Sequence, residues 1–533
     1  MSVLHLALVV LSAIGLALAF PPWDVTAASW VALAPFLWVL GDLPPHRAAV
    51  AGLLWGTLHT WGIGWWVPVA ISGYWGQPAW FGIVFSLLAS IVFVGTYTAA
   101  FAACAAWAAS RVSGTRRVTL LAALWVAFEL ARARVLTGDP WLLSGYALVP
   151  YETVVQTADA GGVYLLSFLL AWVNACVAEV PRQLPHGLRA ALRPVALGVA
   201  AVVLATGYGA FRLDASYGSA NEPPRRVAIV QGNVDVETQW RPELREVSLA
   251  RYLDLSRDVA RHSRPELLIW PESAITFFLA TEPQLRESIG RTLGAIGATL
   301  IVGGPHVDGT PDDERYFNSA FLVDPRGRVR ARYDKAHLLP FAEYFPLRSI
   351  ALLRRHFERV RTFTPGTGDV VLATAIGNAG IAICFEAIFP ELVREQVRRG
   401  AEILVNLSND AWLGAGPGPA QHLRMVRLRA IESRRWLVRS TTTGVSAIVD
   451  PHGRVVSSVP ANEAGALAGT VVPLRGVSPY QRVGDLFAYA CAAGSALAMV
   501  VLRGVPPRSA RAKLAARSSG VPDDSSGSAL HAE

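Results

Sequence analysis

Three side chains that could act together in covalent catalysis each follow an apolar, strand-like run of the sequence. They are Glu272, Lys335 and Cys384. A cysteine attacks a carbonyl carbon as its thiolate, and a carboxylate can accept the proton of the thiol. A lysine ammonium can stabilise the thiolate and the oxyanion that forms next. Because functional groups converge at strand ends along one edge of an α/β sheet, the three residues predict a nucleophilic site.

Cys384 differs from the other three cysteines in its surroundings. Cys104, Cys176 and Cys491 lie inside long hydrophobic stretches, whereas Cys384 lies in a more polar block. Because it is the only cysteine of that block, it cannot form a disulfide there, and its thiol stays free even in an oxidising compartment. The alternative is a structural role. A free cysteine packs well as a small hydrophobic residue, and charged residues near strand ends are usually solvated or ion-paired.

The polar block, which we place at residues 222–480, has the pattern of an α/β domain. Short β-branched runs alternate with amphipathic stretches, which favours a layered sheet with helices packed on it. The predicted strands are Arg226–Val230, Glu266–Trp270, Thr299–Val302, Asn318–Val323, Gly380–Cys384, Ile403–Leu407 and Ser446–Val449. The predicted helices are Leu244–His262, Pro283–Gly297, Phe389–Arg399 and Gln421–Arg434. Turn signals at Asp324–Gly327 and Asp450–Gly453 fit hairpins.

The rest of the chain has the composition of a membrane protein. Of its 533 residues, 52% are hydrophobic and only 17% are charged, and a membrane-spanning helix needs about 20 mainly apolar residues. Seven apolar stretches precede the polar block and one follows it: Leu4–Phe20, Ala27–Leu40, Ala49–Ile71, Ala79–Ala109, Val118–Leu130, Gly161–Val180, Pro194–Phe211 and Leu486–Leu502. We therefore expect a membrane domain of seven helices at 1–215, an eighth helix at 484–504 and a disordered basic cytoplasmic tail at 505–533.

The first apolar stretch has a second interpretation, because Ala17–Ala19 resembles the cleavage site of a signal peptide. No lysine or arginine precedes that stretch, so a retained helix is favoured.

The distribution of arginine and lysine predicts the orientation in the membrane. Cytoplasmic loops carry an excess of these residues. An N-terminus in the cytoplasm places the following residues on that side: Arg47, Arg111, Arg116, Arg117, Arg182, Arg189, Arg193, Arg503, Arg508, Arg511, Lys513 and Arg517. The polar block then lies outside the cytoplasm. Arg132 and Arg134 go against the pattern, and with Glu129 they either pair internally or meet lipid headgroups.

Other classes of site have little support in the sequence. The net charge is +8, but the arginines flank apolar stretches and no basic-aromatic motif accompanies them, which argues against nucleic-acid binding. The histidines lack the spacing of metal ligands, and the glycine pairs lack the context of a phosphate-binding loop. We expect no cofactor and no metal.

Three short motifs occur in a family-specific order. Trp270–Ser273, Tyr333–Lys335 and Ile383–Glu386 resemble the signatures of the nitrilase (carbon–nitrogen hydrolase) superfamily. That resemblance implies an αββα sandwich. A domain of this kind between seven helices and an eighth resembles the apolipoprotein N-acyltransferase family. Further stretches carry the same resemblance: Val230–Asn233, Trp240, Pro340–Pro346, Ser408–Trp412, Gln421–His422 and Arg439–Gly444.

The resemblance implies roles for individual residues. Glu272 is then the general base, Lys335 the electrostatic stabiliser and Cys384 the nucleophile. Glu343 and Glu386 match supporting acidic positions, and positions near the substrate cleft are matched by Trp240, Glu386, Phe385 and Trp412. Phe385 stands where familiar members of the family have tyrosine, so no hydrogen bond from that hydroxyl is essential here.

The resemblance also implies a two-step reaction in the bacterial inner membrane. Cys384 takes an acyl chain from a phospholipid, phosphatidylethanolamine, and passes it to the α-amino group of diacylglyceryl-cysteine in an apolipoprotein. We expect a monomer whose loop Leu338–Phe341 keeps water from the thioester. Two alternatives stay open: a membrane-tethered amidase acting on a small amide, and a membrane scaffold with a decayed hydrolase domain. The presence of all three catalytic residue types argues against decay.

Overall fold

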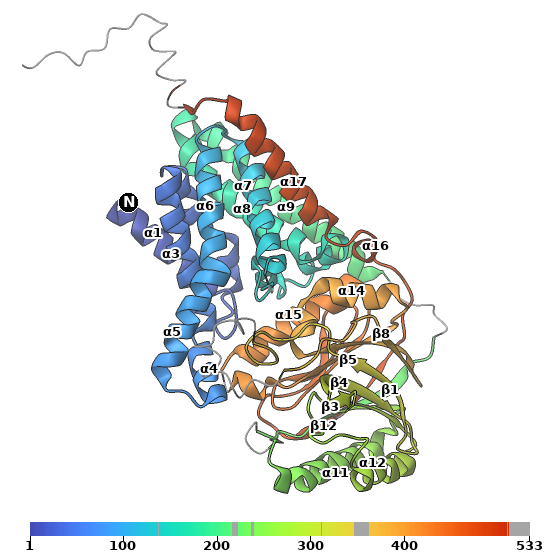
Figure 1. The fold of residues 1–533 in the computed structure, drawn as a ribbon. Coiled ribbons are helices and arrows are strands. Elements are labelled where there is room, and N and C mark those ends of the chain that lie inside the picture. The colour runs from blue at the N-terminus through green and yellow to red at the C-terminus, as the bar shows by residue number, and fades with distance from the viewer. Residues whose placement is uncertain are drawn as a thin grey trace, which may run out of the picture.

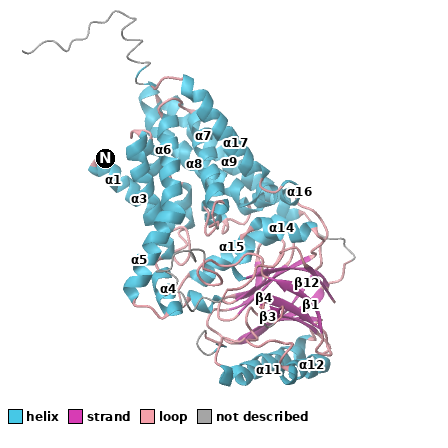
Figure 2. Ribbon diagram, in the orientation of Figure 1, coloured by secondary structure: helices cyan, strands magenta, loops and turns pink. Residues whose placement is uncertain are grey.

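The computed structural model describes residues 1–136, 138–215, 222–235, 239–310, 312–345, 362–414, 416–508 and 510. Within these residues a helical unit lies against an α/β unit (Figure 1). The first nine α-helices and the last long helix, α17, belong to the helical unit. The strands gather in the α/β unit, where helices flank them (Figure 2). The chain thus enters the α/β unit once and returns to the helical unit at its end.

The helical unit consists of α-helices joined by short 3-10 and π-helical turns. Its elements are α1 (Val3–Ala17), η1 (Thr26–Trp30), α2 (Ala34–Leu40), α3 (Pro45–Gly64), α4 (Val67–Trp75), α5 (Ala79–Ser90), η2 (Ile91–Gly95), α6 (Thr96–Ala109), α7 (Thr115–Arg134), η3 (Ser144–Leu148), η4 (Val154–Thr157), α8 (Ala158–Gln183), η5 (Leu184–His186), α9 (Leu188–Asp214), α16 (Pro479–Val483), α17 (Leu486–Val501) and η10 (Leu502–Gly504).

Four helical stretches of the described residues are long and apolar enough to cross a membrane. They are Ala79–Ala109, Val154–His186, Leu188–Asp214 and Leu486–Gly504, and each contains most or all of one predicted span. The other predicted spans are also helical over much of their length, but their helices are shorter or more polar. A membrane-spanning helical unit is therefore confirmed, and the number of eight crossings stays a prediction.

The predicted span Ala27–Leu40 is helical, as a short apolar stretch over Thr26–Leu40, but it is not one regular α-helix. The structure divides it into the 3-10 helix η1 and the short helix α2. The backbone N–H groups of Leu33 and Ala34 both donate to Oδ1 of the buried Asn174 in α8, at 2.9 and 3.0 Å. The first N–H groups of a helix have no partner within the helix, so this side chain lets a new helix start at α2.

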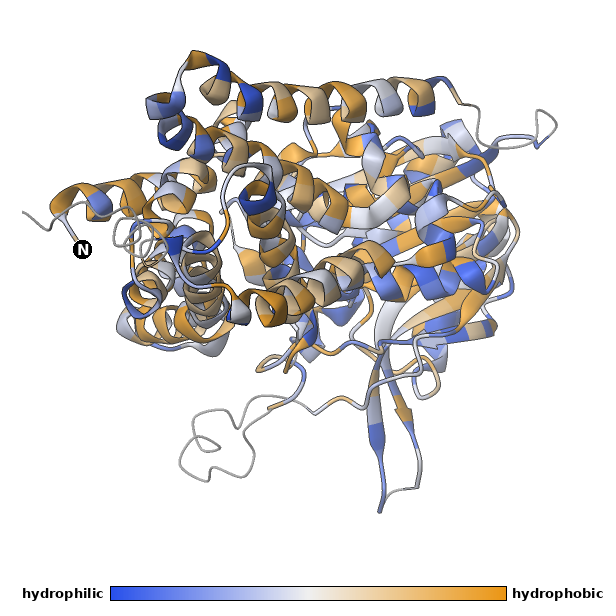
Figure 3. Cartoon of the chain, turned by 90° about the horizontal axis from the view of Figure 1, so that it is seen from above, coloured by the Kyte–Doolittle hydropathy of each residue, from blue (hydrophilic) through white to orange (hydrophobic). Residues whose placement is uncertain are grey.

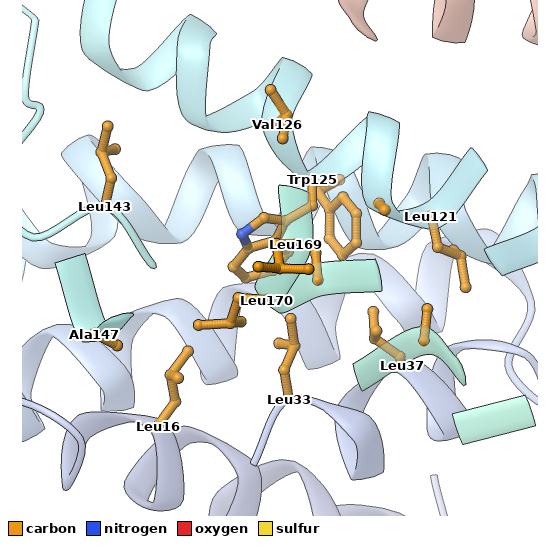
Figure 4. Packing of buried hydrophobic residues seen from close by; sticks show 14 of the residues in the cluster. Leu16, Leu33, Leu37, Leu121, Trp125, Val126, Leu143, Ala147, Leu169 and Leu170 are labelled. Atoms are coloured by element: carbon orange, nitrogen blue, oxygen red, sulfur yellow. The ribbon is translucent and has the colours of Figure 1, made fainter. Parts of the chain in front are cut away.

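The interior of the helical unit is packed with aliphatic and aromatic side chains (Figure 4). Trp125 lies among leucines from several helices, and its indole N–H donates to Ser144 Oγ at 2.9 Å. On the outside, α9 exposes Val199, Val203 and Leu204. Figure 3 shows apolar residues along the helices of this unit, with hydrophilic residues more frequent in the α/β unit. An apolar exterior of this kind suits contact with lipid.

The α/β unit contains two six-stranded sheets. Its elements are β1 (Arg225–Gln231), η6 (Pro242–Leu244), α11 (Arg245–Ser263), β2 (Leu267–Ile269), α12 (Pro283–Ile296), β3 (Thr299–Asp308), β4 (Arg315–Val323), β5 (Val329–Asp334), β6 (Val371–Thr374), β7 (Gly377–Ile383), η8 (Cys384–Ile388), α14 (Pro390–Arg398), β8 (Ile403–Ser408), η9 (Asp410–Leu413), α15 (Gly418–Ser433), β9 (Leu437–Thr441), β10 (Ser446–Val449), β11 (Val455–Val459) and β12 (Gly465–Val471). The strand orders are β12-β1-β2-β3-β4-β5 and β11-β10-β9-β8-β7-β6.

The two sheets pack face to face, with helices on their outer faces. Successive residues of a strand point to opposite sides of its sheet. In β1, Val227 and Ile229 pack between the sheets, whereas Ala228 and Val230 pack against α11 and α12. On the second sheet, α14 and α15 take the corresponding outer position. The predicted αββα sandwich is confirmed, and the two turn signals do form the β4–β5 and β10–β11 hairpins.

Helix α15 joins the two units. Val426 and Ala430 pack on the second sheet, while Met425, Leu428 and Ile431 belong to the core of the helical unit. The helix is therefore buried on both faces, and the outer face of the second sheet, which it covers, lies next to the membrane helices. The domain boundaries given above stay a prediction. Most of the predicted disordered tail, 505–533, lies outside the described residues.

Candidate active site

The sandwich brings the three predicted strand-end residues together. Glu272 follows β2 and Lys335 follows β5 of the first sheet, whereas Cys384 follows β7 of the second. The Nζ atom of Lys335 lies 3.3 Å from Oε1 of Glu272. The charges of Glu272 and Lys335 both act on the thiol of Cys384. All three side chains are buried, so their charges interact more strongly than they would in water.

Glu343 completes the charged group. Its Oε1 atom lies 3.0 Å from Nζ of Lys335, and its Oε2 atom accepts the backbone N–H of Leu339 at 2.8 Å. Lys335 thus contacts two carboxylates. Burial alone would lower the pKa of Lys335, but Glu272 and Glu343 outweigh it and raise this pKa well above its ordinary value. The ammonium is therefore charged at every pH at which the enzyme would work.

Asn318 in β4 holds the two carboxylates in place. Its Nδ2 atom donates to Oε1 of Glu272 and to Oε1 of Glu343, each at 2.7 Å. The other oxygen of Glu272 accepts the backbone N–H of Asn409 at 2.7 Å. The sequence did not indicate Asn318, because a polar residue within a strand carries no signal of its own. Asn409 lies in Ser408–Trp412, one of the stretches that resemble the family, so the sequence could have indicated it as a site residue.

Cys384 has a strained backbone and a buried thiol. Its φ is +52°, a value that non-glycine residues adopt rarely and that costs conformational energy. Burial, followed by the charge of Glu272, raises the pKa of the thiol to about 12, against the opposing effects of Lys335 and Ser408. The thiol is therefore protonated in the resting site, and it needs a base to become a nucleophile.

Glu386 connects the turn at Cys384 to the segment that carries Lys335. Its carboxylate accepts the backbone N–H groups of Ile383 at 2.7 Å, Ala336 at 2.6 Å and His337 at 3.0 Å. The hydroxyl of Tyr333 donates to it as well, at 2.9 Å. Burial raises the pKa of Glu386 to about 7, although these hydrogen bonds oppose the shift. Glu386 thus fixes the relative position of the nucleophile and the cation without itself facing open space.

A buried ion pair lies close enough to the thiol for its Asp410 to act on Cys384. Arg439 donates to Asp410 at 2.6 Å, and Nδ1 of His422 lies 3.2 Å from both of these side chains. Burial favours the neutral acid, but Arg439 and His422 hold the pKa of Asp410 well below its ordinary value. This group explains His422 as a packing and hydrogen-bonding residue. Within the described ranges, no cluster of three or more histidine, cysteine, aspartate or glutamate side chains could hold a metal ion.

The predicted cleft residues lie at the margin of this site. Phe385 packs edge-to-face on Phe389 with ring centroids 5.0 Å apart, and it contacts the core of the helical unit. Trp412 is half-buried in η9. Trp240 is 36% exposed and follows Gln239, whose amide accepts from Asn409 at 2.9 Å.

The loop that the sequence marks as a cover reaches the helical unit. Phe341 has a positive φ of 65°, and its ring lies edge-to-face on Phe85 of α5 with centroids 5.4 Å apart. The rings of Phe341 and Phe345 are also edge-to-face, with centroids 5.8 Å apart. Because Glu343 lies between these two phenylalanines in the chain, the loop links the charged group to the membrane helices.

Comparison with known proteins identifies the family. Residues 226–476 match the model of the carbon–nitrogen hydrolases, and residues 12–176 match that of the apolipoprotein N-acyltransferase N-terminal domain. The apolipoprotein N-acyltransferase of Geobacter metallireducens is 36% identical over 499 residues, which cover 92% of this chain and 93% of that protein. This chain belongs to the apolipoprotein N-acyltransferase family.

Other relatives agree with this membership of the apolipoprotein N-acyltransferase family. The apolipoprotein N-acyltransferase of Pseudomonas syringae pv. tomato is 32% identical over 472 residues, covering 87% of this chain and 90% of that protein. Among solved structures, an amidase from Nesterenkonia sp. AN1 aligns with 51% of this chain and 98% of its own, at 20% identity and a TM-score of 0.37.

Proposed function

We propose that this enzyme transfers a fatty acyl chain from a phospholipid to the N-terminal α-amino group of diacylglyceryl-cysteine in apolipoproteins, through a thioester on Cys384. The observation that carries the proposal is the convergence of Glu272, Lys335 and Cys384 beside apolar helices. Membership of the apolipoprotein N-acyltransferase family supports the identity of the acceptor.

The first step forms the thioester. Glu272 takes the proton of the Cys384 thiol, and the sulfur attacks the ester carbonyl of the phospholipid. Lys335 stabilises the oxyanion of the tetrahedral intermediate. The intermediate collapses, the bond to the glycerol oxygen breaks, and Glu272 returns the proton to that oxygen, so that a lysophospholipid leaves. Because burial and Glu272 raise the pKa of the thiol, Cys384 needs the base in order to become a nucleophile.

The second step forms the amide. The neutral α-amino group of the apolipoprotein attacks the thioester carbonyl, and Glu272 accepts a proton from the nitrogen. The carbon–sulfur bond then breaks, and the ammonium of Lys335 stabilises the departing thiolate. The proton on Glu272 passes to the sulfur, which restores the Cys384 thiol. Splitting the transfer in this way requires the lysophospholipid to depart before the acceptor reacts.

The remaining predicted residues have supporting roles in this scheme. Glu343 keeps Lys335 charged and oriented, and Glu386 fixes the turn at Cys384. Trp240, Phe385 and Trp412 lie at the margin of the charged group, where they would line the path of the lipid chains. The loop with Phe341 keeps water from the thioester, since its aromatic contact closes the side toward α5.

The same proposal places the α/β unit on the extracytoplasmic side of the bacterial inner membrane. Both substrates are anchored in lipid, so a site next to the membrane helices meets them without extracting them. The arginines of the short loops support this orientation. We further propose phosphatidylethanolamine as the donor and a monomeric enzyme.

The intact mass of the protein tests the proposal. Incubated with a phospholipid of defined acyl chains, the wild type should gain the mass of one acyl group, and Cys384→Ala should gain none. Cys104→Ala removes a thiol from α6 and should behave as the wild type. An unmodified wild type that hydrolyses small amides would instead support a membrane-tethered amidase.

A further inference from the structure

The two oxygens of Glu272, the proposed base, differ in how many hydrogen bonds they accept. Oε1 accepts from Asn318 at 2.7 Å and from Lys335 at 3.3 Å. Within the described ranges, Oε2 accepts only the backbone N–H of Asn409, at 2.7 Å. A carboxylate oxygen has two lone pairs, so Oε1 is fully engaged and Oε2 has one lone pair left. The proton of the thiol therefore goes to Oε2, and whatever fixes Asn409 also fixes the accepting oxygen.

Gln239 contacts both chain segments that flank this oxygen. Its Nε2 atom donates to the carbonyl oxygen of Ser273 at 2.5 Å, and its Oε1 atom accepts from Nδ2 of Asn409 at 2.9 Å. Ser273 directly follows Glu272 in the chain, and Asn409 donates to the carboxylate of Glu272. The amide of one glutamine thus closes a ring of contacts that begins and ends at the base.

The orientation of the Gln239 amide is fixed by its partners. The side chain is 4% exposed, so no bulk water replaces a lost hydrogen bond there. A carbonyl oxygen only accepts, so the amide nitrogen must face Ser273 and the amide oxygen must face Asn409. Ser273 has a φ of +55°, a left-handed value that costs conformational energy. The hydrogen bond from Gln239 helps to hold the peptide after the base in this conformation.

The segment after β1 reaches the base at its beginning as well as at Gln239. The backbone N–H of Asn233 donates to the carbonyl oxygen of Thr442 at 2.9 Å. The hydroxyl of Thr442 in turn donates to the carbonyl oxygen of Glu272 at 3.3 Å. Strand β1 also pairs with β2, the strand that Glu272 follows. This segment therefore supports the base, in addition to carrying Trp240 at the margin of the site.

We propose that Gln239 is a positioning residue for acyl transfer. It acts through Asn409 and holds Oε2 of Glu272 in the orientation that accepts the thiol proton. The inference rests on the proposed function, since it takes Glu272 as the base. Both hydrogen bonds of the Gln239 side chain are made to other protein groups, so its effect on the reaction is indirect. Loss of this side chain should slow the chemical step and leave the binding of the lipid unchanged.

The first test replaces the amide by an apolar side chain of similar length. Full-length Gln239→Met in detergent receives a phospholipid of defined acyl chains, and the single-turnover rate of acyl-mass gain is measured at increasing lipid concentrations. The maximal rate should fall about tenfold or more, because a displaced base accepts the proton less readily. The half-saturating lipid concentration should stay the same. Gln284→Met changes an exposed glutamine of α12 and should keep both wild-type values.

The second test asks whether Gln239 acts through Asn409. Asn409→Ala removes the side-chain amide but keeps the backbone N–H that donates to Glu272, and it should lower the maximal rate by a similar factor. Residues of one hydrogen-bond network have effects that do not add. The double variant should therefore be about as slow as either single variant. Two factors that multiply, to about a hundredfold in total, would overturn the inference.

Three further outcomes are decisive. An unchanged maximal rate in Gln239→Met with a raised half-saturating concentration would overturn the inference, because Gln239 would then support lipid binding. Thermal unfolding shows whether each variant is folded. If Gln239→Met is not, Asn409→Ala alone decides, and an undiminished maximal rate in that variant overturns the inference. Absence of any acyl adduct in the wild type would refute the proposed function instead.

Discussion

At the scale of single residues, the neutral amide of Asn318 holds the two carboxylates of the site in position beside the lysine ammonium. The ammonium of Lys335 lies within hydrogen-bond distance of two carboxylates in a buried space. The sequence predicted Glu272, Lys335 and Cys384, because each follows a strand-like run and has the residue type that the chemistry needs. It could not predict Asn318, because its partners Glu272 and Glu343 meet it only after the strands pair.

Replacing Asn318 with alanine should slow acylation of Cys384 without unfolding the protein. Two hydrogen bonds to charged groups are lost, each contributing about 1.5–3 kcal/mol. Glu272 and Glu343 can then rotate away from their present positions. We expect the single-turnover rate of thioester formation to fall by about tenfold or more. Asn378→Ala, which removes an exposed amide at β7, is the control. Equal rates in the two variants would show that Asn318 has no part in positioning the base.

The pH dependence of thiol alkylation tests the charges around Cys384. Because burial and Glu272 raise the pKa of the thiol to about 12, its alkylation by iodoacetamide should still increase with pH above about pH 10, where an ordinary cysteine has nearly levelled off. Glu272→Gln removes a negative charge that disfavours the thiolate, so alkylation at pH 8 should become faster although acyl transfer is lost. Lys335→Met removes a charge that favours the thiolate and should make alkylation slower. Shifts of the same sign in both variants would contradict these assignments.

At the scale of elements, local pattern predicted the strands and helices better than it predicted their ends and interruptions. The ends of the predicted α/β elements lie within three residues of the observed ends, except that β3 continues to Asp308, past the predicted end at Val302. The division of Ala27–Leu40 depends on Asn174, which lies about 140 residues further along the chain, so no local pattern could reveal it. The sequence also did not indicate β6, β9 and β12. Length is not the reason, because β2 and β10 were predicted and are no longer than these strands.

Glu386 connects the end of β5 to the turn after β7, because its carboxylate accepts backbone hydrogen bonds from both segments. In Glu386→Gln, one accepting oxygen becomes an N–H donor that faces the backbone N–H groups of Ile383, Ala336 and His337. Hydrogen exchange of these three amides should increase by about tenfold or more, because each would lose a hydrogen bond to a charged group. Exchange followed by peptide mass analysis would detect this. Glu395→Gln on the outside of α14 should leave the same peptides unchanged, and equal protection in both variants would contradict the role.

At the scale of the whole molecule, the two units are joined by buried ion pairs as well as by α15. Asp159 of α8 accepts from Arg434 at the end of α15, at 2.6 Å, and from Arg212 of α9. The side chains of Asp159 and Arg434 are almost fully buried. Composition and hydropathy indicated a membrane unit and an α/β unit. They could not indicate how the units dock, because the docking residues are charged side chains that resemble surface residues in the sequence.

Asp159→Asn should destabilise the junction far more than the loss of an exposed pair at the same boundary. Removing one partner of a buried pair leaves the remaining charge without compensation, which costs about 3–5 kcal/mol, and here two arginines lose their counter-charge. Glu152→Gln is the matched control, because Glu152 also bridges the units, to Arg454, but both side chains are about half exposed. Such a pair contributes about 1 kcal/mol or less. Thermal unfolding in detergent should therefore show a clearly lower midpoint for Asp159→Asn. The midpoint of Glu152→Gln should be almost the same as that of the wild type. Equal midpoints would mean that apolar packing along α15, rather than these charges, holds the catalytic unit against the membrane helices.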